Sequence, residues 1–586
     1  MASTNILDLN RAFSHPKFLH ILAIVGIISN GLLFSLHLIY LIYGPILYLA
    51  EIHGVLIFGV FLFNLFIAYV IGRLVNKKTS LGYRVNMLSI YYLAISGLAM
   101  FMNLFGNFVI SATNPGVEWE MTLSIITIVT SIISIPAFGL FLCVMAIQYK
   151  RQEDDGGYTR KKHVLSGWQV KVIRYSRRLL IFLSTLILLG GGFFFNLVLF
   201  FPSLHENLQW VGVFVPQFAA FFFFIFMGDT VILLRLERRE KTPKIFFTTM
   251  IIGFIISGTC LVPIVTTNTT IAAADNEFAN AFGNDWKDRI PSEVTDSFLK
   301  TQFYLSSYFI NNARFDYVLS EDILFYTGTT GNDVGITLFF DAYLPARDAS
   351  SLPGNYSTLV RIHGGGWQIG DKGRGNMVSM NKYFAHMGYV VFDVQYGLRS
   401  GGWDLPIITP EHVLGDNITT DDMVRHLGLF FQYITAQQST FGCNLNSTFI
   451  SGGSAGGHLT CAAGLAIVSG NYTSLFGNNI TVKGLIPFYP GNGLAFGELR
   501  GSNDEFWDPT LLVNSSSPPC LIFQGTHDFP EIVDASYRFK NAYTSYERPC
   551  ALLIFPFAGH GNDIHFSGHY NQVFLYYMER FMYLYH

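Results

Sequence analysis

Long apolar segments without basic residues restrict the fold of this chain more than any other feature. Within the first 267 residues, no Lys or Arg occurs from Leu19 to Gly72, from Val85 to Tyr149 or from Leu179 to Leu234. Buried helices of a soluble domain do not explain such stretches, whereas about 20 apolar residues in a helix cross the ~30 Å of bilayer hydrocarbon. We therefore predict an all-α polytopic membrane domain at 1–267, with about seven helices at 18–43, 53–72, 87–112, 122–148, 179–202, 209–234 and 245–267.

Basic residues occur only in alternate connections between these predicted helices. Cytosolic loops of membrane proteins are enriched in Lys and Arg, so we expect a cytosolic N-terminus and place all residues after the seventh helix outside the cell or in an organelle lumen. The first helix is too long for the core of a signal peptide and is interpreted as a signal anchor. The sequence does not distinguish the plasma membrane from the endoplasmic reticulum. The only charged residues in the connections after the first, third and fifth helices are Glu51, Glu118, Glu120 and Glu206. The basic residues before the first helix and in the other connections include Arg11, Lys17, Arg73, Lys77, Lys78, Arg84, Arg160, Lys161, Lys162, Arg177, Arg178, Arg235, Arg238, Arg239, Lys241 and Lys244.

Sequons, cysteines and charge all differ between the two halves of the chain. Residues 1–267 have a net charge of +9 and residues 268–586 one of −12, and the acidic half contains no basic run, which argues against a nucleic-acid partner. Cys443, Cys461, Cys520 and Cys550 lie in the C-terminal half, where an oxidising compartment would permit disulfides and buried free thiols are the equal alternative. The seven Asn-x-Ser/Thr sequons, which are candidate glycosylation sites, are at Asn268, Asn355, Asn417, Asn446, Asn471, Asn479 and Asn514.

Residues 321–586 are predicted to form one α/β domain, after a linker and N-terminal cap at 268–320. Short, continuously apolar strands alternate with helical segments, which is typical of a mostly parallel sheet covered by helices on both faces. The predicted strands are Gly335–Leu344, Leu359–His363, Tyr389–Val394, Thr448–Ser451, Val482–Tyr489, Cys520–Gln524 and Ala551–Pro556, and the predicted helices are Thr420–Phe441, Ala455–Gly470 and Tyr570–Tyr585.

A Gly-x-Ser-x-Gly sequence centred on Ser454 lies between one of these strands and a helix of small residues. This context is that of a nucleophile elbow, in which the serine occupies a sharp strand-to-helix turn. The motif alone is weak, and its alternative is a helix-capping serine in a tight turn. The flanking strand and helix make Ser454 the predicted nucleophile.

An acid and a histidine follow Ser454 in the order Ser…Asp…His. Asp528 comes shortly after the predicted strand Cys520–Gln524, and it would orient the histidine and stabilise its protonated form. His560 lies between Gly559 and Gly561 in the loop after the last predicted strand, and the glycines would let its side chain reach the serine as the general base. Competing residues are interpreted as solvated acids or as surface or helix-start histidines: Glu531, Asp534, His565 and His569.

The sequence His363-Gly-Gly-Gly-Trp367 directly follows the predicted strand Leu359–His363. Such a loop supplies backbone N–H groups to the oxyanion of a tetrahedral intermediate. We expect the N–H groups of Gly365 and Gly366, with that of Ala455 after the nucleophile, to form the oxyanion hole. His363 is interpreted as a brace for this loop, and Trp367 either lines the pocket or packs.

Together these motifs resemble the esterase/lipase group of α/β-hydrolases, over residues 320–586. The group includes hormone-sensitive-lipase-like, feruloyl-esterase-like and prenylcysteine-methylesterase-like enzymes. Gly453 stands where hormone-sensitive-lipase-like members usually have Asp, and Gly525-Thr-His-Asp528 does not match their Asp-Pro-Leu-x-Asp segment. The resemblance therefore favours the feruloyl-, acetyl- or methylesterase-like branch. No family is recognised for the membrane domain.

The leading hypothesis is a membrane-anchored serine hydrolase that cleaves a small-molecule or lipid ester, with the bilayer as its other partner and no metal or cofactor. The alternative is a seven-span receptor or transporter whose hydrolase-like domain binds ligand without turnover. Asp229, the one carboxylate within a predicted span, is a candidate transport residue, although its position six residues before Arg235 favours an interfacial acid.

Overall fold

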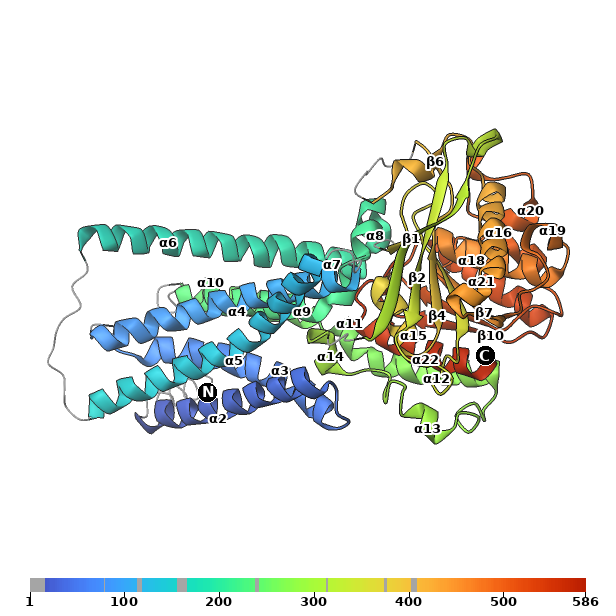
Figure 1. The fold of residues 1–586 in the computed structure, drawn as a ribbon. Coiled ribbons are helices and arrows are strands. Elements are labelled where there is room, and N and C mark those ends of the chain that lie inside the picture. The colour runs from blue at the N-terminus through green and yellow to red at the C-terminus, as the bar shows by residue number, and fades with distance from the viewer. Residues whose placement is uncertain are drawn as a thin grey trace.

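The computed structural model has a helical bundle at one end and an α/β domain at the other (Figure 1). It describes residues 16–77, 79–112, 118–154, 166–237, 242–311, 315–373, 377–401 and 408–586. Several basic loop residues on which the predicted orientation depends lie outside the described residues: Arg11, Lys78, Arg160, Lys161, Lys162, Arg238, Arg239 and Lys241.

Six helical segments among the described residues are long and apolar enough to cross a membrane, by length and composition. The seventh predicted span, 245–267, falls on α10, a shorter apolar helix of 17 residues, Pro243–Thr259. A turn, α11 (Val262–Val265) and α12 (Thr267–Phe282) follow it, so the predicted N-terminal helical domain is confirmed with a shorter last helix. The bundle otherwise consists of α2 (Pro16–Tyr43), α3 (Leu49–Leu74), α4 (Ser80–Ala112), α5 (Glu118–Asp154), α6 (Gly167–Thr185), a π-helical turn (Leu186–Gly191), α7 (Gly192–Phe200), α8 (Glu206–Gly212) and α9 (Ala219–Leu236).

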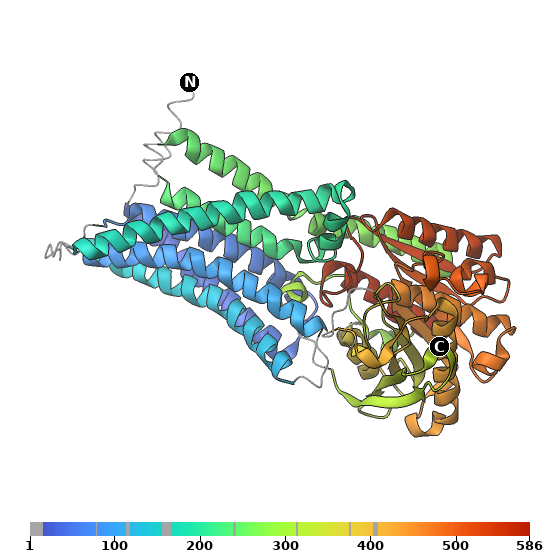
Figure 2. The ribbon, with the colours of Figure 1, turned by 90° about the horizontal axis from the view of Figure 1, so that it is seen from above.

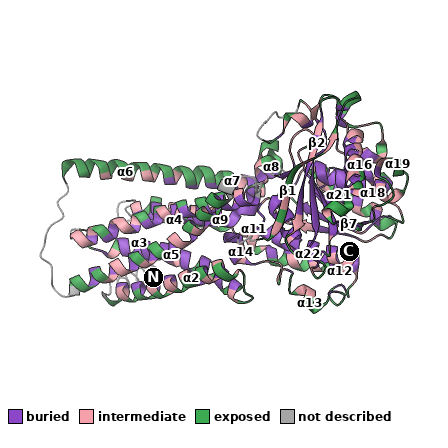
Figure 3. Ribbon diagram, viewed as in Figure 1, coloured by how far each residue is buried: buried purple, intermediate pink, exposed green. Residues whose placement is uncertain are grey.

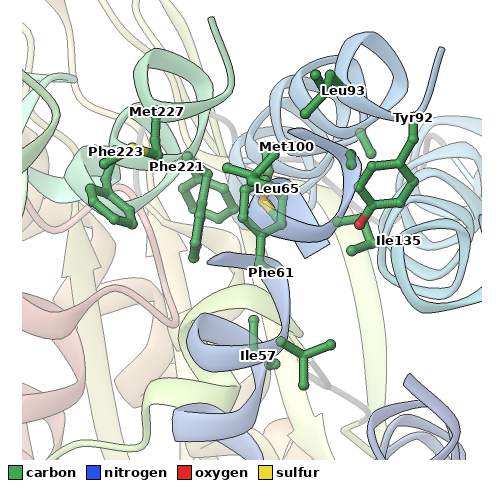
Figure 4. Packing of buried hydrophobic residues seen from close by; sticks show 14 of the residues in the cluster. Ile57, Phe61, Leu65, Tyr92, Leu93, Met100, Ile135, Phe221, Phe223 and Met227 are labelled. Atoms are coloured by element: carbon green, nitrogen blue, oxygen red, sulfur yellow. The ribbon is translucent and has the colours of Figure 1, made fainter. Parts of the chain in front are cut away.

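The α8–α9 segment is the most buried of the six, and the α6–α7 segment is the least. Of their most apolar windows, 72% is buried in the former and 28% in the latter, where α6 lies along the outside of the bundle (Figure 3). The bundle core is rich in aromatic side chains, among them Phe61 of α3 and Phe221 of α9 (Figure 4). Asp229 is on this central α9 and only 8% exposed.

The α/β domain contains an eight-stranded sheet of β1 (Tyr317–Thr327), β2 (Thr337–Pro345), β3 (Ser357–Ile362), β4 (Val390–Val394), β7 (Asn444–Gly453), β8 (Val482–Phe488), β9 (Cys520–Gly525) and β10 (Cys550–Phe555), in the order β1-β2-β4-β3-β7-β8-β9-β10. The β1–β2 and β2–β4 pairs are antiparallel and the other pairs are parallel. The mostly parallel sheet is therefore as predicted, and β1, which the sequence analysis did not identify, is its antiparallel edge.

Helices cover both faces of this sheet, so each face has its own hydrophobic core. On one face lie α16 (Thr420–Ala436), α18 (Ala455–Ser469) and α21 (Pro530–Ser545). On the other lie α12, α15 (Val378–His386) and α22 (His569–Tyr585). All six cysteines are buried free thiols, so the free-thiol alternative holds in this structure.

The segment between the two parts of the chain packs against both of them. Helix α12 packs on β10 and α22, whereas α14 (Leu305–Phe309) packs on α3 of the bundle. The division of the chain at residues 267 and 320 stays a prediction.

The α/β domain packs on one end of the bundle, as Figures 1 and 2 show from two directions. The carboxyl end of α4 reaches it, where the Ser379 hydroxyl donates to the Ile110 carbonyl oxygen (3.1 Å) and the Phe566 N–H to the Ser111 hydroxyl oxygen (3.1 Å). The end of α7 also reaches it, with the Phe200 and Phe557 rings 5.9 Å apart. The described connections at this end of the bundle, 44–48 and 201–205, contain no Lys or Arg.

Candidate active site

Ser454 occupies the sharp turn between β7 and α18, with backbone angles φ 58° and ψ −118°. A positive φ is uncommon for a residue with a side chain, and such conformations concentrate at functional sites. The turn is also crowded, since a Cβ on either Gly452 or Gly456 would collide with the Ile362 carbonyl oxygen. The strand, turn and helix are those of a nucleophile elbow.

The structure brings the three predicted catalytic residues together from three separate loops. His560 Nε2 lies 2.8 Å from Ser454 Oγ, and His560 Nδ1 lies 2.9 Å from Asp528 Oδ1 and 3.2 Å from Oδ2. A carboxylate only accepts hydrogen bonds, so Nδ1 carries the ring proton and Nε2 is left to accept the Ser454 hydroxyl proton. This arrangement has the geometry of a serine nucleophile with an oriented general base.

The Asp528 carboxylate is fully buried at the carboxyl end of β9. It accepts hydrogen bonds from Gln524 Nε2 (3.0 Å) and from the Phe529 N–H (2.7 Å), and Gln524 is in turn fixed by the Ser536 hydroxyl (2.7 Å). Gln524 is not among the site residues predicted from the sequence. The competing acids Glu531 and Asp534 are exposed, as expected.

The glycine loop after β3 lies directly beside the elbow, and a Cβ on Gly364 would lie 2.8 Å from the Gly453 carbonyl oxygen. Gly365 and Gly366 have φ of 121° and 59°, which favour glycine. In the part of the chain that the structure describes, the N–H groups of Gly365, Gly366 and Ala455 have no hydrogen-bond acceptor. Three unused donors beside Ser454 could bind a negatively charged oxygen.

Two buried histidines brace this loop. The His363 ring stacks on Tyr396 with centroids 4.4 Å apart, and burial lowers the pKa of His363 to about 4. The Trp367 indole N–H donates to His458 Nδ1 (3.1 Å), and His458 Nε2 donates to the carbonyl oxygen of Phe506 (2.8 Å). Burial lowers the pKa of His458 to about 4 as well, which agrees with this neutral tautomer. Trp367 is buried and therefore packs.

A buried polar pair that the sequence analysis missed lies behind His560. The Tyr489 ring is 4.6 Å from the His560 ring, and its hydroxyl donates to Asp563 Oδ1 (2.6 Å). Burial raises the pKa of the Asp563 carboxyl. Tyr489 directly follows β8, and a side chain at that position points to the edge of the sheet where sites form. That position is the signal that could have identified it.

The bundle contributes to the surroundings of His560. The Trp210 ring of α8 lies 6.2 Å from the His560 ring in an edge-on arrangement, and 5.1 Å from the Phe529 ring. A Cβ on Gly559 would lie 3.1 Å from the Gly212 carbonyl oxygen, so the backbones of α8 and the histidine loop are in contact.

Hydrogen bonds join the same histidine loop to the end of α8 and to the segment after it. Asn562 Nδ2 donates to the carbonyl oxygens of Gly212 (2.9 Å) and Val213 (2.8 Å), and the His565 N–H donates to Gln217 Oε1 (2.6 Å). The prediction that His565 is a surface or helix-start histidine is wrong, because it is fully buried at this junction. His569 does begin α22, where it is also buried.

A cavity of about 500 Å³ lies between the end of α7 and the loop that contains Asp528. It reaches the triad from the side of Asp528 and does not contact Ser454 or His560. Its lining residues are Phe200, Phe201, Pro202, Ser203, Leu204, Thr526, His527, Asp528, Pro530, Val533 and Asp534.

Two further predictions about sites concern metal ions and glycans. Across the described residues, no group of three His, Cys, Asp or Glu side chains could hold a metal ion. Six of the seven sequon asparagines are exposed, and Asn514 is half-buried. Glycosylation and the lack of a cofactor stay predictions.

Residues 340–494 match the BD-FAE family model, an esterase-like α/β-hydrolase family, and the domain has the corresponding fold. Among solved structures, a putative carboxylesterase from Lactobacillus plantarum WCFS1 is 17% identical, with a TM-score of 0.33 over 41% of this chain and 87% of its own. Esterase B from Lactobacillus rhamnosis is also 17% identical, with a TM-score of 0.33 over 51% of this chain and 90% of its own. Thermogutta terrifontis esterase 2 is 22% identical, with a TM-score of 0.32 over 41% of this chain and 85% of its own. A comparison with curated proteins found no match.

Proposed function

We propose that this protein is a membrane-anchored serine hydrolase that cleaves carboxylic esters on the extracellular or luminal side. One observation supports this function above all others: His560 bridges Ser454 Oγ (2.8 Å) and Asp528 Oδ1 (2.9 Å) at a strained strand-to-helix turn. A serine that only caps a helix would not require a histidine within hydrogen-bond distance, or a buried carboxylate bonded to that histidine.

The reaction follows from the positions of these groups. Ser454 Oγ attacks the ester carbonyl carbon while its proton moves to His560 Nε2, and Asp528 stabilises the resulting imidazolium. The carbonyl oxygen becomes an oxyanion beside the N–H groups of Gly365, Gly366 and Ala455.

Collapse of this intermediate breaks the bond to the alcohol oxygen, which takes the proton from His560. A water molecule then attacks the carbonyl carbon of the acyl-enzyme while its proton moves to His560 Nε2. His560 returns this proton to Ser454 Oγ as the bond between Ser454 and the acyl group breaks, which releases the carboxylic acid.

The proposed side of the membrane has separate support. The catalytic domain packs on the end of the bundle where the described connections 44–48 and 201–205 lack Lys and Arg, and loops of that kind are typically not cytosolic. The six exposed sequons agree with a compartment in which glycans are added.

A fluorophosphonate probe that does not cross membranes tests the function and the side together. Cells that express the full chain would be labelled intact and after opening with detergent, in wild type, Ser454→Ala and Ser203→Ala. Ser203 is an exposed serine beside the nearby cavity and serves as the matched control. We expect wild type and Ser203→Ala to be labelled and Ser454→Ala to remain unlabelled.

The result also separates the alternatives. Labelling of intact cells would place Ser454 outside the cell. Labelling only after detergent would mean that Ser454 faces either an organelle lumen or the cytosol, and protease protection of sealed vesicles would distinguish these two positions. If folded wild-type protein remains unlabelled even in detergent, the esterase proposal is wrong and the receptor or transporter alternative gains support.

A further inference from the structure

The proposed catalytic histidine lies beside the first turns of a candidate membrane-spanning segment. Trp210 is in the first turns of the apolar segment Glu206–Leu236, on α8 at the hydrolase end of the bundle. Tryptophan is enriched at that depth because one part of the indole is apolar and its N–H is polar. Since the rings of Trp210 and His560 are only 6.2 Å apart, the triad is at nearly the same depth.

This depth is fixed by backbone contacts. The Gly559 backbone touches that of Gly212, and Asn562 donates to two consecutive carbonyl oxygens of the bundle. A hydrolase on a flexible tether would move freely above the membrane, whereas these contacts hold the histidine loop against α8.

The segment 201–210, which includes Trp210 beside His560, exposes large apolar side chains. Phe201, Leu204 and Trp210 are 57%, 68% and 48% exposed. They continue the exposed apolar surface of α7, which includes Phe193, and no charged residue occurs from Gly192 to His205. An exposed apolar surface continuous with membrane-spanning helices matches the hydrocarbon edge of a bilayer.

From this placement we infer that the substrate is an ester whose hydrocarbon chain stays in the adjoining membrane leaflet while its carbonyl reaches Ser454. The inference rests on the proposed esterase function and names its substrate class. Trp210, supplied by the membrane domain, forms the wall between the leaflet and the triad and determines the preference for such esters. The ester groups of membrane lipids lie between headgroups and hydrocarbon, so the carbonyl is presented without removing the chain from the bilayer.

The sequence departs from hormone-sensitive-lipase-like enzymes at two places, and that comparison does not favour lipid esters. That comparison uses Gly453 and the segment Gly525–Asp528, which shape the elbow and the acid loop. It contains no information on Trp210, which comes from a different part of the chain.

Two esters with the same leaving group test this inference. Full-length protein would be placed in phosphatidylcholine nanodiscs and supplied with water-soluble 4-nitrophenyl butyrate or with bilayer-dissolved 4-nitrophenyl palmitate. We expect wild type to hydrolyse the palmitate, and Trp210→Ala to lose at least ten times more kcat/KM for the palmitate than for the butyrate. The matched control is Trp168→Ala, because Trp168 is 72% exposed at the opposite end of the bundle, at the start of α6 (Figure 1).

The outcomes separate this inference from the function on which it rests. If wild type hydrolyses the butyrate but not the palmitate, the inference is overturned and the esterase function stands. Equal losses for both esters in Trp210→Ala, or an equal selective loss in Trp168→Ala, would also overturn it. If neither ester reacts and a fluorophosphonate does not label Ser454, the function and the inference fail together.

Discussion

Replacing Gln217 with Ala tests whether the helical bundle holds the proposed catalytic histidine, His560, in place. Gln217 is fully buried just before α9, and its Oε1 accepts the His565 N–H at 2.6 Å. Its Nε2 is directed at the carbonyl oxygens of Val213 and Gly561, the latter at 3.5 Å. Gly561 directly follows His560, so one side chain of the bundle contacts the loop that carries the proposed general base at two points, Gly561 and His565.

The size of the effect follows from the hydrogen bonds that are lost. Truncation leaves the buried His565 N–H without an acceptor, which costs about 1–3 kcal/mol. If the loop relieves this cost by moving, the fraction of enzyme with His560 beside Ser454 falls. Each 1.4 kcal/mol of this cost lowers that fraction, and with it kcat, by a factor of about ten. We therefore expect kcat for 4-nitrophenyl butyrate to fall by about 5- to 150-fold while KM changes less than threefold, because Gln217 lies behind the loop and not in the substrate path.

The measurement uses purified full-length protein in nanodiscs, with steady-state kinetics and fluorophosphonate labelling rates. Gln209→Ala is the matched control, because Gln209 is also a buried glutamine, lies two turns earlier in the same segment, and bonds to nothing through its side chain among the described residues. It should retain kcat within about twofold.

Three results would refute the reasoning about Gln217. The first is an unchanged kcat in Gln217→Ala, which would mean that the loop keeps its position without this contact. The second is an equal fall in Gln209→Ala, which would indicate general damage to the bundle. The third is a rise in KM at constant kcat, which would place Gln217 in substrate binding.

Other groups give shorter predictions. Asp528→Asn should lower kcat about 10⁴-fold with the fold retained, since it removes the carboxylate that selects the His560 tautomer; activity above a tenth of wild type in an ester assay would contradict this role. Gly456→Ala should destabilise the domain by about 1–3 kcal/mol or more, because its Cβ meets the Ile362 carbonyl oxygen, and an unchanged unfolding midpoint would contradict it. Burial holds the pKa of His458 at about 4, so below the ordinary value near 6.5 the unfolded chain binds a proton that the folded chain excludes. The free energy of unfolding should therefore fall as the pH drops from 6.5 towards 4, by up to about 1.4 kcal/mol per pH unit from this histidine. Denaturant unfolding should show a weaker fall in His458→Gln, and an equal or steeper fall in that variant would contradict this role of His458.

That the three candidate triad residues lie close together could be predicted because each one is in a short loop after a strand of the same sheet. Ser454 follows β7, Asp528 follows β9 and His560 follows β10, and the carboxyl ends of parallel strands meet at one edge. The hydrophobic pattern of these strands is continuous, so their positions were clear from the sequence.

Other elements could not be predicted from local pattern. Strand β1 is an edge strand with irregular pairing to β2 and mixed exposure, so it has neither a continuous nor an alternating apolar pattern. Gln217 and Trp210 act on a loop more than 300 residues later in the chain, and sequence separation of that size leaves no local signal. Helix α10 ends earlier than expected because hydropathy does not show where the chain turns after Thr259.

The packing of the histidine loop on α8 gives a second reason for the glycines on either side of His560. From the sequence, Gly559 and Gly561 were interpreted as giving the histidine freedom to reach the serine. In the structure a side chain on Gly559 would meet the Gly212 carbonyl oxygen at 3.1 Å, and one on Gly561 would meet Val213 at 3.3 Å. Small residues on both surfaces let the two backbones approach closely, as they do between packed membrane helices. The loop that carries the proposed general base is therefore shaped to fit the bundle, and the bundle packs directly against one side of the candidate active site.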